Sequence, residues 1–155
     1  MEERINKAVE LFMSGYGCCQ SVVGAFADLY GLTPVQAMAL AAGFGGGVGR
    51  MRMMCGAVSG LVILAGLNDG QTKADDRIGK AHCYKTVQNL LARFKELNGS
   101  LVCAELLGLK GDVPNTDYVP AKRNASYYKT RPCAAKVESA ARIFAEYLDS
   151  NGVRM

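Results

Sequence analysis

This sequence lacks an apolar run long enough to cross a bilayer. Its most apolar stretch, residues 55–67, falls short of the about 20 residues that a spanning helix needs. Residues 1–7 are mostly charged or polar, so they contain no apolar segment of the kind that secretory signals carry. We therefore expect a cytoplasmic protein with no membrane insertion.

The motifs that bind nucleotide phosphates are absent as well. The glycine tract at residues 43–49 has Val48 where G-x-G-x-x-G requires its third glycine, and no G-x-x-x-x-G-K-[ST] occurs. The net charge is only +4 and the basic residues are scattered, so the sequence does not predict nucleic-acid binding. With 155 residues, 50% hydrophobic and 21% charged, the chain has the size and composition of one globular domain over residues 1–155.

Cysteine pairs with the spacing C-x-x-C are also missing, although the chain has six cysteines. Without C-x-x-C or C-x-x-C-H, neither a thioredoxin-type site nor covalent haem attachment is predicted. Zinc ribbons and bacterial ferredoxins use cysteine pairs or runs with a characteristic close spacing, and no such motif is present. In a reducing cytoplasm, six cysteines still favour metal binding or redox chemistry over structural disulfides. Any sulfur site must therefore be assembled by the tertiary fold.

What the sequence does contain is helical periodicity along most of its length, with no alternation typical of strands. We expect an all-α, single-domain bundle of about six or seven helices, with a glycine-rich break and a long loop at residues 108–131 before the last helix. The expected helices run up to Gly15, from Cys18 to about Leu29, from Pro34 to the glycine tract, from about 53–55 to 68–70, from Thr72 to Asn98, from Ser100 to Leu107 and from Pro132 to Ser150.

Two of these helices carry specific expectations. Thr33 and Gln36 form a capping box at the start of the third helix. The longest helix is expected to bury an apolar face made of Ile78, Ala81, Tyr84, Val87, Leu91 and Phe94.

Four cysteines fall in the first turn of an expected helix: Cys18, Cys55, Cys103 and Cys133. A helix N-terminus presents unpaired N–H groups and partial positive charge, and both favour the thiolate. If these helix ends converge, four thiolates need a cation or a cluster between them. An iron–sulfur cluster, structural zinc or a pair of redox disulfides would each meet that need. Cysteines also occur as small apolar core residues, and this simpler interpretation remains open.

Glycines near these cysteines are candidates for cofactor binding. Gly45, Gly46 and Gly47 form either a flexible break with close helix packing or a nest of N–H groups aimed at anionic sulfur. Gly56 lies one turn from Gly60 on the same helix face, so another helix or a cofactor can approach closely.

Other polar and sulfur-containing residues are interpreted more simply. Arg50 and Arg52 either add positive charge near Cys55 or are solvated surface residues. Cys83 and His82, the only histidine, are interpreted as surface or core filler.

Several blocks of the sequence together match a known pattern. They are residues 15–20 (GYGCCQ), 43–47 (GFGGG), 55–60 (CGAVSG), 99–103 (GSLVC), 106–108 (LLG) and 132–133 (PC). The set resembles a redox-active family named C-GCAxxG-C-C after its cysteines, over nearly the whole chain. The resemblance implies that Cys18, Cys55, Cys103 and Cys133 are the working thiols, and leaves open whether Cys19 replaces Cys18. Members of the family often occur near transporter genes, so the resemblance also implies an association with a transporter, and similar domains in split-Soret cytochromes suggest an iron–sulfur centre.

Three functions follow as hypotheses. The first is an electron-transfer protein in which the four cysteines bind an iron–sulfur cluster. The second is a metal-free thiol–disulfide oxidoreductase with Cys55 as the low-pKa nucleophile. The third is a non-enzymatic binding module with structural zinc or buried cysteines, associated with a transporter. Whether the protein is an enzyme stays open, and its redox partner is unidentified. A mean hydropathy slightly above zero and seven methionines favour a homodimer.

Overall fold

The computed structural model describes residues 1–109 and 117–154. Within these ranges the chain forms eight α-helices and two short 3-10 helices, and its only strand-like pairing is one isolated bridge. The all-α prediction is therefore confirmed. The α-helices are α1 (Glu2–Met13), α2 (Cys18–Phe26), α3 (Pro34–Ala41), α4 (Gly56–Asp69), α5 (Arg77–Asn98), α6 (Cys103–Leu106), α7 (Ala125–Thr130) and α8 (Cys133–Asn151), and the 3-10 helices are η1 (Ala27–Tyr30) and η2 (Ala42–Phe44).

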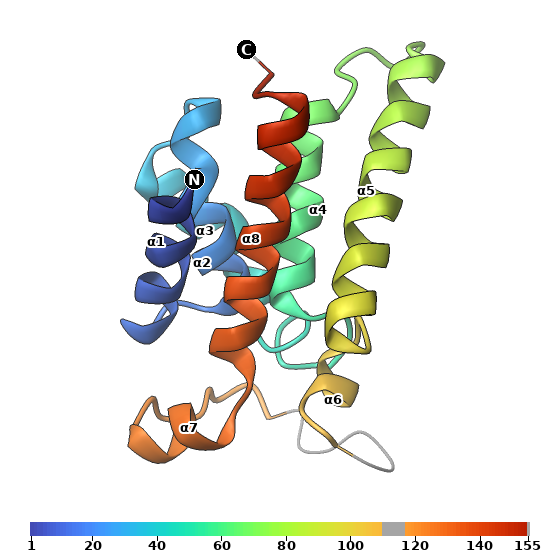
Figure 1. Ribbon diagram of the computed structural model, residues 1–155. Coiled ribbons are helices and arrows are strands. Elements are labelled where there is room, and N and C mark those ends of the chain that lie inside the picture. The colour runs from blue at the N-terminus through green and yellow to red at the C-terminus, as the bar shows by residue number, and fades with distance from the viewer. Residues whose placement is uncertain (110–116, 155) are drawn as a thin grey trace.

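Helix α4 is the centre of the bundle. It packs against α2, α5 and α8, while α1 packs against α2 and α8 (Figure 1). Residues 56–61 of α4 are all buried, which explains why this segment has no polar face. Phe26 and Phe144 meet edge to face beside it, with ring centroids 5.0 Å apart. Aromatic pairs of this kind add to the free energy gained from their burial.

Helices α2 and α4 approach closely because α4 carries glycines on the facing side. A Cβ atom placed on Gly60 would lie 2.8 Å from the Cβ of Val22, and one on Gly56 would lie 3.1 Å from the Cβ of Cys18. The glycines predicted to allow a close approach therefore do so, and the approaching element is a helix. This contact places the start of α2 against the start of α4.

The capping box of α3 is confirmed, whereas the prediction for the longest helix is partly wrong. Thr33 Oγ1 accepts from the N–H of Gln36 at 3.2 Å, and Gln36 Oε1 accepts from the N–H of Thr33 at 2.9 Å. The long helix begins at Arg77 instead of Thr72, because the Asp76 side chain caps it by accepting from the N–H of Gly79.

The expected apolar face of α5 is also wrong in its first half. Ile78 is 86% exposed and Tyr84 is 57% exposed. The buried residues of α5 are Thr86, Leu90 and Phe94, and none of them lies before Thr86. The first half of the periodic pattern therefore has no core to face.

The loop expected at residues 108–131 contains a helix in its described part. Helix α7 begins after Asn124, whose side chain accepts from the N–H of Tyr127 at 2.9 Å. The rest of that prediction falls partly on residues 110–116, which lie outside the described residues. Helix α7 accounts for the count of eight α-helices against the six or seven expected.

The helices are arranged so that several of them begin at one end of the bundle. Helices α4 and α8 both start at the end where α6 and α7 lie, and α5 runs in the opposite direction (Figure 1). In the described ranges, no helix combines the length and the apolar character that spanning a membrane requires.

Candidate functional site

All four cysteines predicted to start helices do so. Cys18, Cys103 and Cys133 are the first residues of α2, α6 and α8, and Cys55 is the N-cap of α4. Each thiol therefore stands where backbone N–H groups are available and where the helix dipole is positive.

The same four cysteines line a single cavity of about 70 Å³. Cys55 and Cys103 are buried, and Cys18 and Cys133 are half-buried. The cavity has room for a group of several atoms, since a water molecule needs only about 10–15 Å³ by a comparable measure. The described residues contain no group of three or more His, Cys, Asp or Glu side chains arranged to hold one metal ion. The thiols thus share a cavity without sharing a single coordination point.

Backbone pairing holds Cys55 and Cys103 side by side. The N–H of Cys55 donates to the carbonyl of Leu101 at 2.8 Å, and the N–H of Cys103 donates to the carbonyl of Met53 at 2.6 Å. These bonds flank the isolated antiparallel bridge between Met54 and Val102. Two segments almost fifty residues apart are thereby joined just before α4 and α6 begin.

The other two cysteines of the cavity are Cys18, at the start of α2, and Cys133, at the start of α8. The close contact of Gly56 with Cys18 brings the first residue of α2 to the start of α4. Cys18 also forms a side-chain hydrogen bond with Cys133. Tertiary packing therefore gathers thiols from four separate segments, as their helix-start positions led us to expect.

The two remaining cysteines lie elsewhere. Cys19 is fully buried in a small apolar cluster with Val23 and Ala37, on the α2 and α3 side. Cys83 is half-buried on α5, beside the exposed His82. Neither cysteine lines the cavity. In the first sequence block it is Cys18 that faces the shared cavity.

The glycine tract contributes part of the cavity wall. Gly46, Gly47 and Gly56 line the cavity, whereas Gly45 lines a neighbouring hollow. A Cβ atom on Gly47 would lie 2.6 Å from the Cβ of Cys103, so only glycine permits this approach. Most N–H groups between residues 48 and 53 donate to carbonyls of the tract itself. In the described structure, the N–H groups of Gly46 and Gly47 donate no backbone hydrogen bond.

Three residues in this loop that are not glycine adopt a left-handed backbone conformation. They are Val48, Arg50 and Arg52, with φ between 62° and 65°. This region is unfavourable for side chains with a Cβ, and most of all for a β-branched residue such as valine. Each such residue costs roughly 1–3 kcal/mol, and such strain is concentrated at functional sites.

Basic side chains surround the thiols. Arg52, Arg123, Arg131 and Lys136 line the cavity, and no aspartate or glutamate is among its described lining residues. Arg52 Nη1 lies 3.7 Å from Cys103 Sγ. The interpretation of Arg52 as a solvated surface residue is therefore wrong, and the thiol that it contacts is that of Cys103.

Arg123 was not identified from the sequence, although it fixes one side of the cavity. Its guanidinium carbon lies 4.3 Å from the ring centroid of Phe12 and 4.7 Å from that of Tyr127. Its Nη1 and Nη2 donate to the carbonyls of Phe12 and Tyr16, each at 3.0 Å. These contacts attach the segment around α7 to the end of α1. No local sequence signal marks Arg123, whereas Arg131 could have been noticed because it lies two residues before Cys133.

The environment divides the thiols into acidic and weakly acidic groups. Burial raises the pKa of Cys55 to about 11, although the N–H groups of Val58 and Ala57 act in the opposite direction. Burial likewise raises the pKa of Cys19 to about 12. The hydrogen bond with Cys133 and burial raise the pKa of Cys18.

Cys133 is the acidic thiol. The hydrogen bond from Cys18 lowers its pKa to about 7 despite burial, and the charges of Arg131 and Arg123 contribute. The expectation that Cys55 is the low-pKa nucleophile is therefore wrong. The reason is that Cys55 is buried without a neighbouring cation strong enough to offset its desolvation.

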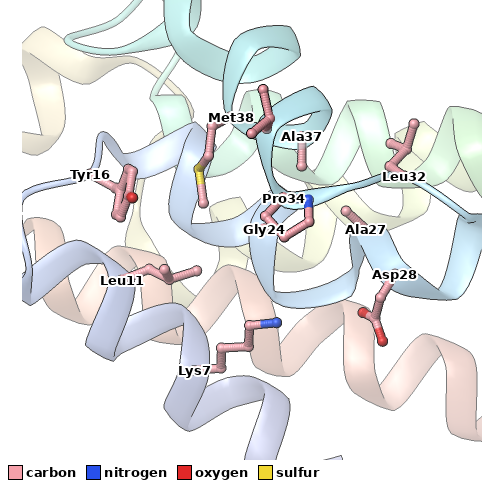
Figure 2. Close-up of a pocket in the computed structure, with 11 residues that line it drawn as sticks. Lys7, Leu11, Tyr16, Gly24, Ala27, Asp28, Leu32, Pro34, Ala37 and Met38 are labelled. Atoms are coloured by element: carbon pink, nitrogen blue, oxygen red, sulfur yellow. The ribbon is translucent and has the colours of Figure 1, made fainter.

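A second cavity lies apart from the cysteines. It has a volume of about 400 Å³ and is lined mainly by apolar residues of α1, α2 and α3, including Leu11 and Met38 (Figure 2). Its one carboxylate, Asp28, accepts two hydrogen bonds from Arg4. No cysteine is among the described residues that line this cavity.

Comparison with known proteins agrees with the sequence pattern. A family model described as "Putative redox-active protein (C_GCAxxG_C_C)" matches residues 16–147. This match covers most of the chain and includes all four cysteines of the cavity, so the chain belongs to this family. No curated protein and no solved structure matches the chain. The class of function that the family description gives is redox activity.

Proposed function

We propose that the protein transfers electrons and that Cys18, Cys55, Cys103 and Cys133 bind an iron–sulfur cluster. The observation that carries the proposal is that thiols from four distant segments line one cavity. A single thiol–disulfide centre needs only two cysteines, whereas a cluster would give all four a role. Four thiolates are the usual ligand set of such clusters, and a bound cluster would supply one-electron redox chemistry.

The four cysteines and the residues around them suit an iron–sulfur cluster. In a cluster the thiolates bind different iron atoms, so the cysteines need not share one coordination point. The cationic side chains of Arg52, Arg123 and Arg131 would balance the negative charge of the thiolates. The free N–H groups of Gly46 and Gly47 would hydrogen-bond to sulfur and affect its potential.

Anaerobic purification with absorbance, iron and acid-labile sulfide measurements tests the proposal. We expect a coloured protein that contains iron and sulfide together. The Cys19→Ser variant is the matched control, because its thiol is adjacent in sequence but lies outside the cavity. A chain that stays colourless and free of iron after anaerobic reconstitution with iron and sulfide would refute it, and stoichiometric zinc would favour the structural-zinc alternative.

The second candidate function is thiol–disulfide exchange by Cys133 and Cys18. The specific observation in its favour is their hydrogen bond, together with the pKa of about 7 for Cys133. The Cys133 thiolate would attack a substrate disulfide and release one substrate thiolate. The Cys18 thiol would then lose its proton and attack Cys133 Sγ, which releases the second substrate thiol. Two electrons would reduce the substrate disulfide and leave a Cys18–Cys133 disulfide.

This alternative has its own test. Equilibration of the metal-free chain in glutathione buffers, followed by peptide mapping, should reveal a Cys18–Cys133 disulfide that forms reversibly. If these two residues never pair while other cysteines do, the alternative fails. A homodimer, a cytoplasmic location and a neighbouring transporter remain predictions in both cases.

A further inference from the structure

Two open hollows adjoin the cysteine cavity, and the same arginines line all of them. One hollow has a volume of about 290 Å³ and the other about 550 Å³. Arg52 and Arg131 line both hollows and the cysteine cavity. Arg50 lines both hollows, and Arg123 lines the larger hollow and the cysteine cavity. We call these four arginines the arginine mouth.

The arginine mouth differs in its partners from Arg4, Arg93 and Arg142, although not from Arg154, which donates to the carbonyl of Gly70. Arg4, Arg93 and Arg142 form ion pairs with carboxylates. Over residues 1–109 and 117–154, by contrast, Arg52, Arg123 and Arg131 take part in no ion pair, and their contacts are with a thiol, carbonyls and rings.

Arg50 shows the same type of contact, since its Nη1 donates to the carbonyls of Asp117 and Val119. No aspartate or glutamate is among the described residues that line the three spaces. Among the described residues, no carboxylate therefore balances the positive charge of Arg52, Arg123 and Arg131, and this charge is available to a ligand. Walls of low dielectric around a cleft of one charge sign concentrate its field on an approaching ligand.

The backbone of the loop indicates that the placement of these arginines costs conformational free energy. Arg50 and Arg52 both adopt the left-handed conformation, which directs their side chains from a tightly hydrogen-bonded turn. Guanidinium groups are planar forks that suit carboxylate and phosphate oxygens, and a mouth built from arginine instead of lysine favours such ligands.

We propose that the reaction partner of the cysteine site is a small anionic molecule, carrying carboxylate, phosphate or a similar oxyanion group, that binds in the arginine mouth. This inference rests on the proposed redox role of the cysteines. The hollows are concave and their volumes match those of small-molecule sites, which favours a small anion over an acidic protein surface.

The test compares two thiol reagents of similar size and different charge on the reduced full-length chain. Iodoacetate is anionic and iodoacetamide is neutral, and mass spectrometry gives the rate of each at Cys133. We expect the iodoacetate-to-iodoacetamide rate ratio at Cys133 to exceed that of glutathione by about tenfold, since electrostatic focusing raises association rates by factors of about 10–10³. Inorganic phosphate at matched ionic strength should slow both reagents.

Variants separate charge recognition from effects on thiol acidity. Arg131→Gln should lower the rate ratio several-fold, and the ratio cancels any change in the amount of thiolate. Arg142→Gln is the matched control, because this arginine pairs with Glu2 on α1, away from the mouth. It should leave the ratio unchanged.

A rate ratio equal to that of glutathione, or a lack of protection by phosphate, would overturn the inference. The measurement uses the reduced chain without a cluster, so its failure leaves the iron and sulfide test of the proposed function standing. Conversely, a chain that binds no iron can still show the charge preference.

Discussion

At the scale of single residues, the position of a cysteine at a helix start does not by itself set its acidity. Cys18, Cys55 and Cys133 all begin helices, yet the pKa is raised at Cys18 and Cys55 and lowered only at Cys133. Burial opposes the thiolate at each site, and only Cys133 has a thiol donor together with nearby arginine charges. Local position therefore supplies N–H groups, and tertiary neighbours decide which thiol ionises.

The acidity of Cys133 leads to a prediction. Replacement of Cys18 by alanine removes the hydrogen bond that stabilises the Cys133 thiolate, so the pKa of Cys133 should rise from about 7 towards its ordinary value of 9.0. The pH midpoint of iodoacetamide alkylation at Cys133, followed by mass spectrometry of the reduced chain, measures this. Cys19→Ala should leave the midpoint in place, and an unchanged midpoint in Cys18→Ala would contradict the assignment.

A buried carboxylate provides a second prediction at this scale. Burial of Asp69 acts to raise its pKa, but hydrogen bonds from Thr86, Tyr147 and Asn68 outweigh it and lower the pKa below 3.8. Since the folded pKa is depressed, this stabilisation is complete above the unfolded value and is lost as the pH falls through the folded pKa.

Asp69→Asn should therefore lower the free energy of unfolding by about 1–3 kcal/mol at neutral pH. Urea unfolding at pH 7 and at pH 3 compares the two proteins, and the difference should shrink at the lower pH. If the two proteins differ in free energy of unfolding by the same amount at both pH values, the charge of the Asp69 carboxylate does not contribute to stability.

At the scale of secondary-structure elements, the contact between α2 and α4 sets the distance between Cys18 and Cys55. Gly60→Ala would press a Cβ against Val22 and should lower the free energy of unfolding by about 1–3 kcal/mol. Gly66→Ala in the same helix is the matched control, since its Cβ would meet nothing within 4 Å. It should raise stability by up to about 1 kcal/mol. Thermal or urea unfolding measures the stability of both variants. Equal changes in the free energy of unfolding would contradict the packing role of Gly60.

The loop before α4 gives another prediction of this kind. Val48 has φ of 64°, which glycine adopts freely, so Val48→Gly should raise the free energy of unfolding by about 1 kcal/mol. Val35→Gly on the exposed side of α3 is the comparison, because there glycine only weakens a helix. Urea unfolding compares the two variants. If Val48→Gly lowers the free energy of unfolding as much as Val35→Gly does, the backbone at Val48 is not strained.

Much of this architecture could be predicted from the sequence, because caps and apolar spacing are local signals. The capping box of Thr33 and Gln36 and the helix starts at all four cysteines are of this kind. The exposed face around Ile78 could not be predicted, since periodicity does not show where the core ends. Helix α7 and the role of Arg123 depend on aromatic contacts with α1, which lies more than a hundred residues away.

At the scale of the whole molecule, the fold brings helix starts and basic side chains to one end of the bundle. Helices α4 and α8 begin there together with α6, and the arginine mouth surrounds the cavity that their cysteines line (Figure 1). The opposite end of α4 carries the Asp69 network instead. The bundle therefore separates a structural polar network from a site of sulfur and positive charge, and the second is where we place the redox chemistry.

The most direct test of this account is the iron and acid-labile sulfide content of single cysteine variants, prepared and reconstituted anaerobically. We predict that serine at position 18, 55, 103 or 133 removes most of the iron and sulfide. Serine in place of Cys19 or Cys83 should leave the wild-type content, because neither residue lines the cavity. A wild-type chain that takes up no iron and sulfide, or an equal loss in all six variants, would contradict the claim that four gathered thiols hold a cluster.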